Sequence, residues 1–466
     1  MLRICKLEMK TLNNFILLLA CFFILLGIRL YVNQPLSGDE PHYLLMVYSL
    51  SHDKDLNLKN NYLNKDLESL YPNLSPVNQI GNLQVENNSI KWYSIHGVGL
   101  PILLLPGFLI AGELGAIITM VFISTVVLWL TWIWVFDVTK NKGLATLSSI
   151  ILLTCYSFNG LAGYIYPDII IAGITLAALI IIHRYSNNLL YQFIFGLIIG
   201  FMILVHFKSL AVALPLFLVL IYKQWSKHRK IPWVSVVGFL PLALFFFIST
   251  YVWFGVWNPA TIYSGLSFTQ ASVFFIVSGI LFDSMRGILV NNPILLLIPL
   301  GLPIWFKSNR EKLLIAAFVA LPSILILANF GEWNGGDSPT GRYIIDILPI
   351  FIPAIAYSIS ALKKLKRSLP ILLYLITFFI TVDFVLIKRA YVRFDTRSPL
   401  FIQIERHLGV ALDRFLPTFS TKTTITSNHG LIKIILCYVA LFMLFYFGLK
   451  LSKSFNNFKV SDPARK

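Results

Sequence analysis

The sequence predicts an all-α polytopic membrane protein that crosses a bilayer about twelve times, with a long first outer loop that carries interfacial helices. Of its 466 residues, 57% are hydrophobic and only 13% are charged. Soluble domains carry roughly 25% charged residues, so this surplus of apolar side chains has to face lipid. The apolar residues also occur in long runs, and a membrane-spanning helix needs about 20 of them in succession.

The positive charges orient these helices. The formal net charge is +17, and the lysines and arginines form short clusters between apolar segments, as at residues 140–142, 223–230 and 363–367. Such clusters mark cytoplasmic loops, whereas a face that binds nucleic acid would be continuous. We therefore expect a bilayer and no nucleic acid as partner. No small-residue cleavage site follows the first apolar stretch, so we expect an uncleaved helix there.

The alternation of apolar and basic segments gives the expected order of crossings. The apolar run 97–112 contains Pro101 and Pro106 and is too short to span, so we place it at the outer interface. We therefore expect a protein of a bacterial inner membrane with both termini on the cytoplasmic side. The expected crossings are 12–31, 114–136, 144–162, 168–184, 189–206, 209–223, 232–254, 288–306, 313–330, 343–361, 370–387 and 431–450.

This order divides the chain into three parts. Residues 1–387 form a transmembrane catalytic core that includes the outer loop 33–112. Residues 388–430 form a small basic outer segment, and 431–466 form the last helix with a basic cytoplasmic tail. The basic outer segment departs from the charge rule, which long loops follow less strictly.

Two adjacent carboxylates, Asp39 and Glu40, follow the first helix, with His42 and Tyr43 close behind. A carboxylate beside apolar surroundings has a raised proton affinity, which suits a general base that takes a proton from a hydroxyl. The alternative is structural, because Ser37 and Glu40 have the spacing of a helix capping box. Both interpretations stay open at this point.

Lys91 and His96 end the same loop and flank Trp92 and Tyr93. A lysine and a histidine beside aromatic rings could hold a phosphate group. The same residues fit an aromatic belt with a lysine that extends its charge to the membrane surface.

Three cations lie near outer helix ends, where the charge rule disfavours them. Lys208 stands between two apolar helices, and an unpaired charge there is costly. Arg286 begins the next inward span, with a local pair to Asp283 as the alternative. Asp168, at an outer turn, fits an N-cap, and we interpret it in that way.

The third cation, Arg342, ends a loop in which Gly335 and Gly336 allow close approach of a ligand and Trp333 adds an aromatic face. The fork of donors on a guanidinium matches phosphate oxygens. The alternative is a salt bridge to one of the two acids of the same loop. Outer cations together with a candidate base describe a site for an anionic, lipid-linked donor and a neutral acceptor.

The order of these features resembles the GT-C-type glycosyltransferases. This polyprenyl-phosphate-sugar-dependent class includes protein O-mannosyltransferases and the lipid A aminoarabinose transferase. The resemblance covers most of the chain. It rests on Asp39-Glu40 after the first helix, on Lys208 at the start of a helix, and on two later segments, Arg286-Gly287-Ile288 and the turn from Trp333 to Tyr343.

The resemblance implies an inverting transfer of a hexosyl or pentosyl group at the outer membrane face, from a polyprenyl-phosphate-linked donor to a hydroxyl of a lipid, glycan or protein acceptor. Asp39 would deprotonate that hydroxyl. A divalent cation on Asp39, Glu40 and His42 is compatible with the family, in which some members use a metal. The remaining implied roles are acceptor positioning by Glu40, His42 and Tyr43, binding of the donor phosphate by Lys91, Lys208, Arg286 and Arg342, and a ligand loop of His96, Trp333, Gly335 and Gly336.

Two other classes of function compete with this one. An O-antigen-type polymerase or ligase also uses outer arginines, although the early Asp-Glu pair disfavours it. A transporter of lipid-linked saccharides needs polar residues within its helices, and here polarity concentrates at one face.

Overall fold

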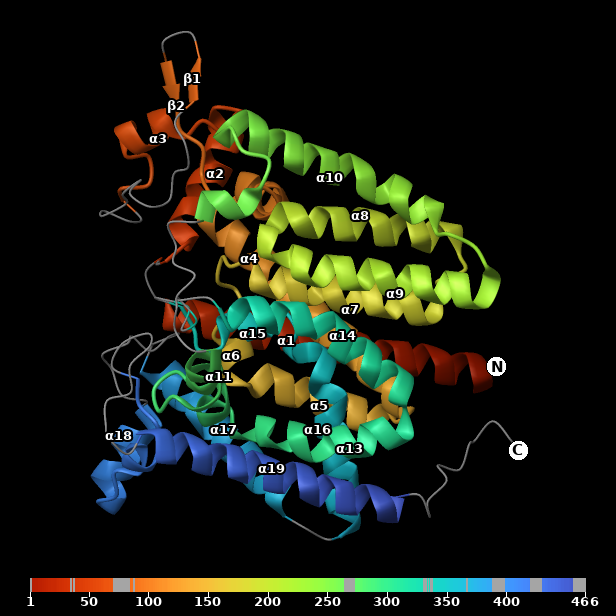
Figure 1. Ribbon diagram of the computed structural model, residues 1–466. Helices are drawn as coiled ribbons and strands as arrows, with labels where there is room; N and C mark the ends of the chain where they lie inside the picture. Colours follow the sequence, from red (N-terminus) through yellow and green to blue (C-terminus); the bar gives the residue numbers. More distant parts are fainter. Residues whose placement is uncertain are drawn as a thin grey trace.

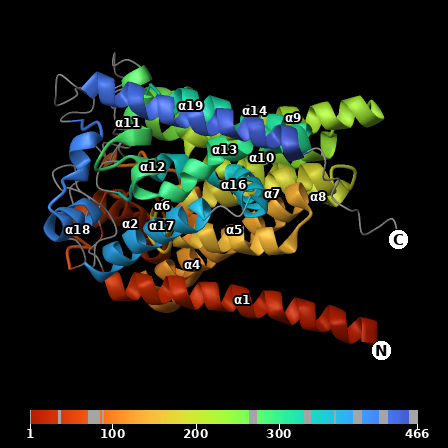
Figure 2. The same ribbon diagram turned by 90° about the horizontal axis from the view of Figure 1, so that it is seen from below.

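The helices run roughly side by side along one direction (Figure 1). This computed structural model describes residues 2–33, 36, 38–69, 84–86, 89–263, 273–329, 333, 335, 338–365, 368–387, 399–419 and 430–455. The start of α1 and the end of α19 lie at one end of the bundle, and α2, α11 and α18 lie at the other, as Figure 2 also shows. The helices are α1 (Leu2–Val32), α2 (Glu40–His52), α3 (Lys59–Asn64), α4 (Gly99–Thr139), α5 (Lys142–Thr154), α6 (Tyr156–Asn159), α7 (Asp168–Arg184), α8 (Leu189–Val205), α9 (Leu210–His228), α10 (Trp233–Phe254), α11 (Val273–Phe282), α12 (Ile288–Asn291), α13 (Leu297–Ser308), α14 (Arg310–Leu327), α15 (Arg342–Ile345), α16 (Leu348–Lys364), α17 (Leu369–Leu386), α18 (Pro399–Leu408) and α19 (Gly430–Phe455).

The predicted helical membrane class is confirmed. Within the described residues, five helical stretches are long and apolar enough to cross a membrane: Gly99–Thr139, Phe207–His228, Trp233–Ile262, Leu369–Leu386 and Gly430–Lys453. Several shorter apolar helices lie beside them. The count of twelve crossings stays a prediction, as does the separate outer segment 388–430, of which the structure describes 399–419 and Gly430.

Three predicted spans are interrupted, and backbone chemistry explains each interruption. The span 144–162 ends early as α5 and resumes as the short α6, since Cys155 takes an extended conformation. The span 288–306 is divided at Pro293, and the span 343–361 is divided before Pro349, a residue of the first turn of α16. Proline lacks an N–H and disfavours helical geometry in the residue before it, so a helix restarts there.

The predicted outer loop 33–112 contains a short β-hairpin that the all-α prediction missed. Strands β1 (Gln84–Glu86) and β2 (Ser89–Lys91) pair antiparallel, with Val85 opposite Ile90. Three-residue strands have too little alternation to be recognised in a sequence. Figure 1 shows this hairpin projecting beside α3 at the end of the bundle away from the start of α1.

The long helix α4 is bent back on itself where the sequence predicted a boundary between two apolar runs. Ala111 and Gly112 leave helical geometry, and Gly112 adopts a φ of 57° that glycine accepts without strain. The two arms then touch at Gly107 and Gly115. A Cβ atom on Gly115 would lie 1.9 Å from the carbonyl oxygen of Gly107, so the backbones approach as closely as glycine permits.

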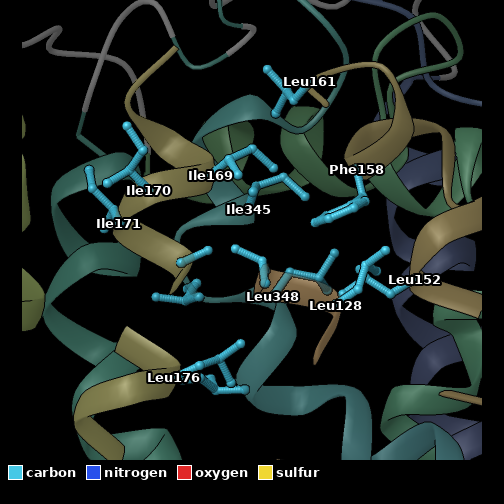
Figure 3. Packing of buried hydrophobic residues seen from close by; sticks show 14 of the residues in the cluster. Leu128, Leu152, Phe158, Leu161, Ile169, Ile170, Ile171, Leu176, Ile345 and Leu348 are labelled. Carbon is cyan, nitrogen blue, oxygen red and sulfur yellow. The ribbon is translucent and has the colours of Figure 1, made fainter. Parts of the chain in front are cut away.

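Aliphatic side chains fill the middle of the bundle (Figure 3). Leu128 of α4, Leu152 of α5, Leu176 of α7 and Leu348 of α16 are all buried and converge on one another there. Burial of one such side chain from water stabilises a fold by roughly 1.5–3 kcal/mol. In a bilayer, where lipid tails are as apolar as leucine, close van der Waals packing supplies much of the stabilisation instead. This packing fixes α7 and α16, whose outer ends border the polar site described below.

We expect Gly115→Ala to lower the melting temperature of the detergent-solubilised protein, because the added methyl group overlaps the Gly107 carbonyl. Overpacking of this kind costs about 1–3 kcal/mol. Gly27→Ala is the matched control, since nothing lies within 4 Å of a Cβ atom at Gly27. Tryptophan-fluorescence melting curves measure both. Equal melting temperatures for the two variants would contradict the close approach of the two arms.

Candidate active site

Several of the residues that the sequence singled out meet at the end of the bundle opposite the start of α1. The start of α2, the start of α7, the short helix α15 and the 3-10 turn Phe207–Ser209 before α9 all contribute. Helix α15 contacts α7, and α7 contacts α9, so side chains from distant parts of the sequence share this region.

Arg342 lies at the centre of the site and joins two carboxylates. Its Nη2 atom lies 2.5 Å from Oδ2 of Asp39, and its Nε atom lies 3.0 Å from Oδ2 of Asp168. Lys208 pairs with Oδ1 of Asp168 and lies 3.1 Å from Oδ2 of Asp346. We call these five residues the ion-pair network. The structure thus brings together three predicted site residues, Asp39, Lys208 and Arg342.

Solvent reaches this network mainly at Asp39. The Asp39 side chain is 24% exposed, whereas that of Arg342 is 5% exposed and that of Asp168 is fully buried. Lys208 is 18% exposed. Buried charges need partners because desolvation costs several kcal/mol per ion. An incoming ligand would therefore meet Asp39 first and the guanidinium behind it.

Aromatic rings support the two cations. The guanidinium carbon of Arg342 lies 4.2 Å from the ring centre of Tyr166 and 5.2 Å from that of Tyr343. The ammonium of Lys208 lies 4.8 Å from the Tyr343 ring. Such cation–π contacts favour the charged form and fix its position.

Glycines set the backbone around Arg342. Gly341, directly before α15, has a φ of 76°, and Gly335 has a φ of 81°. A Cβ atom on Gly335 would lie 3.6 Å from Cβ of Arg342, so this loop packs against the arginine. The Ser338 hydroxyl donates to the Gly335 carbonyl at 2.6 Å. Gly336, predicted in the same loop, lies outside the described residues.

Trp333 anchors this loop to the rest of the protein. Its ring lies against Gly279 of α11, and the ring of Phe419 is 5.7 Å away at an interplanar angle of 72°. The side chain is 5% exposed and belongs to a small apolar cluster with Ile276 and Ile434. These contacts make Trp333 a packing residue of the loop.

Asp39 begins α2 without capping it. No side-chain cap bond is formed by Asp39, and its carboxylate turns to Arg342. Glu40 is buried, and its Oε1 atom accepts a hydrogen bond of 3.0 Å from the backbone N–H of Ile165. Glu40 thus fastens the start of α2 to the loop before α7, which positions its neighbour Asp39.

Three histidines surround Asp39. His42 and His96 stack with ring centres 5.9 Å apart, and Tyr43 lies 4.7 Å from His96. The Nδ1 atom of His42 shares a 2.6 Å hydrogen bond with the hydroxyl of Tyr62. The Nδ1 atom of His206 accepts the backbone N–H of Lys208 at 3.1 Å. The rings of His42 and His96 are buried beside the carboxylate, and that of His206 is partly exposed.

The geometry does not favour a metal ion on Asp39, Glu40 and His42. Their side chains bond to three different partners, the Arg342 guanidinium, the Ile165 N–H and the Tyr62 hydroxyl. Within the described residues, no group of three histidine, cysteine, aspartate or glutamate side chains is arranged to hold a metal. The three residues do not fit a divalent cation in this arrangement.

Opposing forces set the protonation states. Burial alone would raise the pKa of Asp39, but the charge of Arg342 outweighs burial and holds that pKa well below its ordinary value of 3.8. Burial, followed by the charge of His96, lowers the pKa of His42 to about 3. Burial also lowers the pKa of His96. At neutral pH, Asp39 is charged and both His42 and His96 are neutral.

The other two predicted phosphate-binding residues have different surroundings. Lys91 ends strand β2 of the projecting hairpin. Arg286 is buried in the turn after α11, where its backbone N–H donates to Oδ2 of Asp283 at 2.7 Å. Helix α12, which follows Arg286, contacts α6, and α6 contacts α15. The turn that carries Arg286 is therefore linked to α15 through α12 and α6.

Sequence reasoning missed two members of the network. The interpretation of Asp168 as an N-cap is wrong, because Pro167 holds the cap position and the Asp168 carboxylate pairs with Arg342 and Lys208. Asp346 was not considered. Two signals could have found them: Asp168 is expected at the same membrane depth as the three outer cations, and Asp346 follows Arg342 at the four-residue spacing of a helical ion pair.

No family profile and no curated protein matches this sequence. Solved structures do match. ArnT from Cupriavidus metallidurans bound to undecaprenyl phosphate has a TM-score of 0.54 and 11% identity, over 94% of this chain and 77% of that chain. The apo state of ArnT gives a TM-score of 0.53 and 12% identity, over 95% and 77%.

The chain has a GT-C-type fold. The resemblance inferred from the sequence is confirmed at this level. An oligosaccharyltransferase of Archaeoglobus fulgidus tethered to an acceptor peptide is also similar, with a TM-score of 0.43 and 11% identity over 88% of this chain and 60% of that chain. Sequence identities of 11–12% support the fold alone, so the roles of single residues are argued from the geometry of the ion-pair network.

The depressed pKa of His42 predicts how stability depends on pH. A histidine that stays neutral in the folded state stabilises the protein above its unfolded pKa of 6.5, and this contribution is lost as the pH falls towards about 3. The loss is at most roughly 1.4 kcal/mol per pH unit. We expect His42→Gln to flatten the decline of the melting temperature between pH 7.5 and 5. The exposed His52→Gln is the control, and an unchanged slope in His42→Gln would contradict the assignment.

Proposed function

We propose that this protein is a membrane glycosyltransferase that moves a sugar from a polyprenyl-phosphate donor to an acceptor hydroxyl, with inversion at the anomeric carbon. The observation that carries the proposal is Arg342, a buried guanidinium that holds the partly exposed carboxylate of Asp39 at 2.5 Å. A phosphate binder and a candidate base thus lie in direct contact. The fold supports the same class, since it matches ArnT bound to undecaprenyl phosphate.

The donor phosphate would bind by exchange. A phosphodiester carries one negative charge, as the Asp39 carboxylate does, so it can replace Asp39 at Arg342 without changing the charge of the network. Arg342 keeps its second partner Asp168 throughout, and Lys208 stays between Asp168 and Asp346. The cations therefore remain in place while one anion leaves and another enters. Bidentate contact between a guanidinium and phosphate oxygens favours this exchange.

The exchange also activates the base. Paired with Arg342, Asp39 has too low a pKa to attract a proton from a hydroxyl. Once the phosphate occupies the guanidinium, the effect of burial on Asp39 predominates, and its pKa rises. A general base works best when its pKa approaches the working pH. Asp39 becomes an effective base only when the donor is bound.

The transfer step then follows. Asp39 takes the proton of the acceptor hydroxyl, and the hydroxyl oxygen forms a bond to the anomeric carbon of the donor sugar. The bond from that carbon to the phosphate oxygen breaks, and its electron pair stays on polyprenyl phosphate. Arg342 and Lys208 stabilise the charge that develops there, and Arg286 would add a third positive charge. Asp39, Glu40 and His42 act in this step without a metal ion, because their side chains are not arranged to bind one.

The proposal places this chemistry at the outer face of a bacterial inner membrane. Twelve crossings with both termini in the cytoplasm would put the ion-pair network outside, where a polyprenyl-linked donor and a lipid, glycan or protein acceptor can meet. The start of α1 and the end of α19 lie at the end of the bundle away from the network, which agrees with an even number of crossings. His42 and His96 would lie on the acceptor side of Asp39, whereas Glu40 and Tyr43 are fully buried and would act by positioning the start of α2.

We expect Asp39→Asn to reduce sugar transfer by at least about 100-fold, because the general base is lost. The assay uses nanodiscs and a panel of polyprenyl-phosphate sugars with candidate acceptors. Donor affinity should be unchanged or higher in this variant, since a competitor for Arg342 is removed. Arg342→Ala should instead weaken binding of undecaprenyl phosphate.

Glu68→Gln is the matched control, because Glu68 is an exposed carboxylate of the same outer loop that pairs with Lys65. Full turnover in Asp39→Asn would show that Asp39 is not the base. Undecaprenyl phosphate binding that is equal in the wild type and Arg342→Ala would overturn the donor site. Chain extension of a lipid-linked glycan would identify a polymerase, and passage of lipid-linked saccharide across vesicles without transfer would identify a transporter.

The exchange predicts different pH profiles for the two kinetic parameters. The acidic limb of kcat/KM reports the free enzyme, in which the pKa of Asp39 is depressed by Arg342, and the limb of kcat reports the donor complex. We expect the limb of kcat to lie at higher pH. Initial rates from pH 4.5 to 8 should show an acidic limb in kcat and none in kcat/KM, because the pKa of Asp39 in the free enzyme lies well below its ordinary value of 3.8. Limbs at the same pH would mean that the donor does not displace Asp39 from Arg342.

A further inference from the structure

The end of the bundle where α1 starts and α19 ends holds a second group of charges, which the proposed reaction does not use. Helices α4, α7, α9 and α14 contribute to it. We call this group the distal cluster, and its members are Asp137, Lys140, Arg184, Lys223, Glu311 and Lys312.

Within the distal cluster, Arg184 and Asp137 form a bidentate ion pair. Arg184 donates from Nε and Nη2 to the two carboxylate oxygens of Asp137, with both distances 2.7 Å. Asp137 is almost fully buried. Lys140, at 4.0 Å from the same carboxylate, is exposed. Arg184 therefore neutralises the carboxylate of Asp137, and little negative charge remains to balance the ammonium of Lys140.

Two further lysines lie beside this pair with less compensation. Lys312 donates to the backbone carbonyl of Asp137 at 2.7 Å, a neutral partner. Lys223 lies 3.2 Å from Glu311 and 2.9 Å from Nδ1 of His183. Glu311 is 68% exposed, so its pairing with Lys223 is screened by solvent. The charges of Lys140, Lys223, Asp137 and Glu311 all act on Lys312, which shows how closely the group is gathered.

The distal cluster therefore has an excess of positive charge. Four cations (Lys140, Arg184, Lys223 and Lys312) face two carboxylates (Asp137 and Glu311). Basic residues in a cytoplasmic loop are ordinary, because the charge rule alone places them there. Here, by contrast, they converge from four helices, and Lys223 is only 22% exposed. An anion that enters between these helices would supply the missing counter-charge.

Aromatic side chains indicate the depth of the cluster in the membrane. Tyr222, next to Lys223, is 70% exposed, and Trp225 on the same helix is 49% exposed. Trp233, at the start of α10, is 64% exposed. Exposed tyrosine and tryptophan at helix ends mark the layer of lipid headgroups. The excess charge thus lies at the depth where phospholipid phosphates are found.

We propose that the distal cluster binds the phosphate of an anionic phospholipid headgroup. Basic pockets between membrane helices on the cytoplasmic side recognise such headgroups, and each lysine or arginine adds to the attraction. Lys223 and Lys312 contact the phosphate, and Lys140 strengthens the attraction from the exposed side. The Arg184–Asp137 pair holds α7 against α4 beneath them.

The test is retention of lipid by the full-length protein. Protein in dodecylmaltoside is titrated with dioleoyl phosphatidylglycerol or dioleoyl phosphatidylcholine, and bound lipid is counted by native mass spectrometry while the melting temperature is recorded. We expect selective retention of phosphatidylglycerol with a rise in melting temperature. The double variant Lys223→Gln/Lys312→Gln should bind phosphatidylglycerol about tenfold more weakly, because two phosphate contacts lose their charge.

Three controls make the outcome decisive. A glutamine at position 223 or 312 can still donate a hydrogen bond to Glu311 or to the Asp137 carbonyl, so the double variant loses charge but keeps these contacts. The double variant Lys223→Arg/Lys312→Arg keeps the charge and should retain the lipid. Lys227→Gln, an exposed lysine of α9 outside the cluster, should bind as the wild type does. Equal retention of the two lipids, or full selectivity in the glutamine double variant, overturns the proposal. An equal rise in melting temperature with inorganic phosphate would identify free phosphate as the ligand and overturn the lipid assignment.

Discussion

The pairing of Arg342 with Asp39 and Asp168 is the constraint on which the site depends. Arg342 and Asp39 are 303 residues apart in the sequence, and Arg342 and Asp168 are 174 apart. A guanidinium buried among aromatic rings costs several kcal/mol unless it meets carboxylates. The starts of α2, α7 and α15 must therefore come together, and Lys208 brings in the start of α9 through the same Asp168.

In the proposed mechanism, the fully paired network explains how the site stays idle until the donor binds. With Arg342 bound to it, Asp39 has a low proton affinity. The pair breaks only for an anion that contacts the guanidinium at least as well, and a phosphate does so through several oxygens. Binding of the donor and activation of the base then become one event. A hydroxyl that arrives without a donor, water included, meets a carboxylate that does not deprotonate it.

Much of this site could be predicted because the order of apolar and polar segments along the sequence indicates how deep each residue lies in the membrane. Lys208 and Arg342 stood out because cations at outer helix ends break the charge rule, and Asp39 because it follows the first helix. Depth alone does not give neighbours, which is why Arg286 and Lys91 received the same role although they lie in other surroundings. Asp168 was misassigned because a carboxylate at a helix start fits a cap as well as an ion pair. The breaks near Pro293 and Pro349 were overlooked because apolar runs continue through them.

Two helices connect the ion-pair network with the distal cluster. Helix α7 starts at Asp168 and ends at Arg184, and α9 follows Lys208 and carries Lys223 near its other end. Between these charges the α7 side chains are almost entirely apolar and buried, as with Ile171, Leu176 and Leu179. At about 1.5 Å per residue, a helix of this length covers most of the hydrocarbon core. Charges fixed at both ends hold each helix at one depth, which keeps Asp168 and Lys208 level with Arg342. A helix so fixed, with no charged group along its middle, suits chemistry at one surface better than passage of a polar substrate between the two.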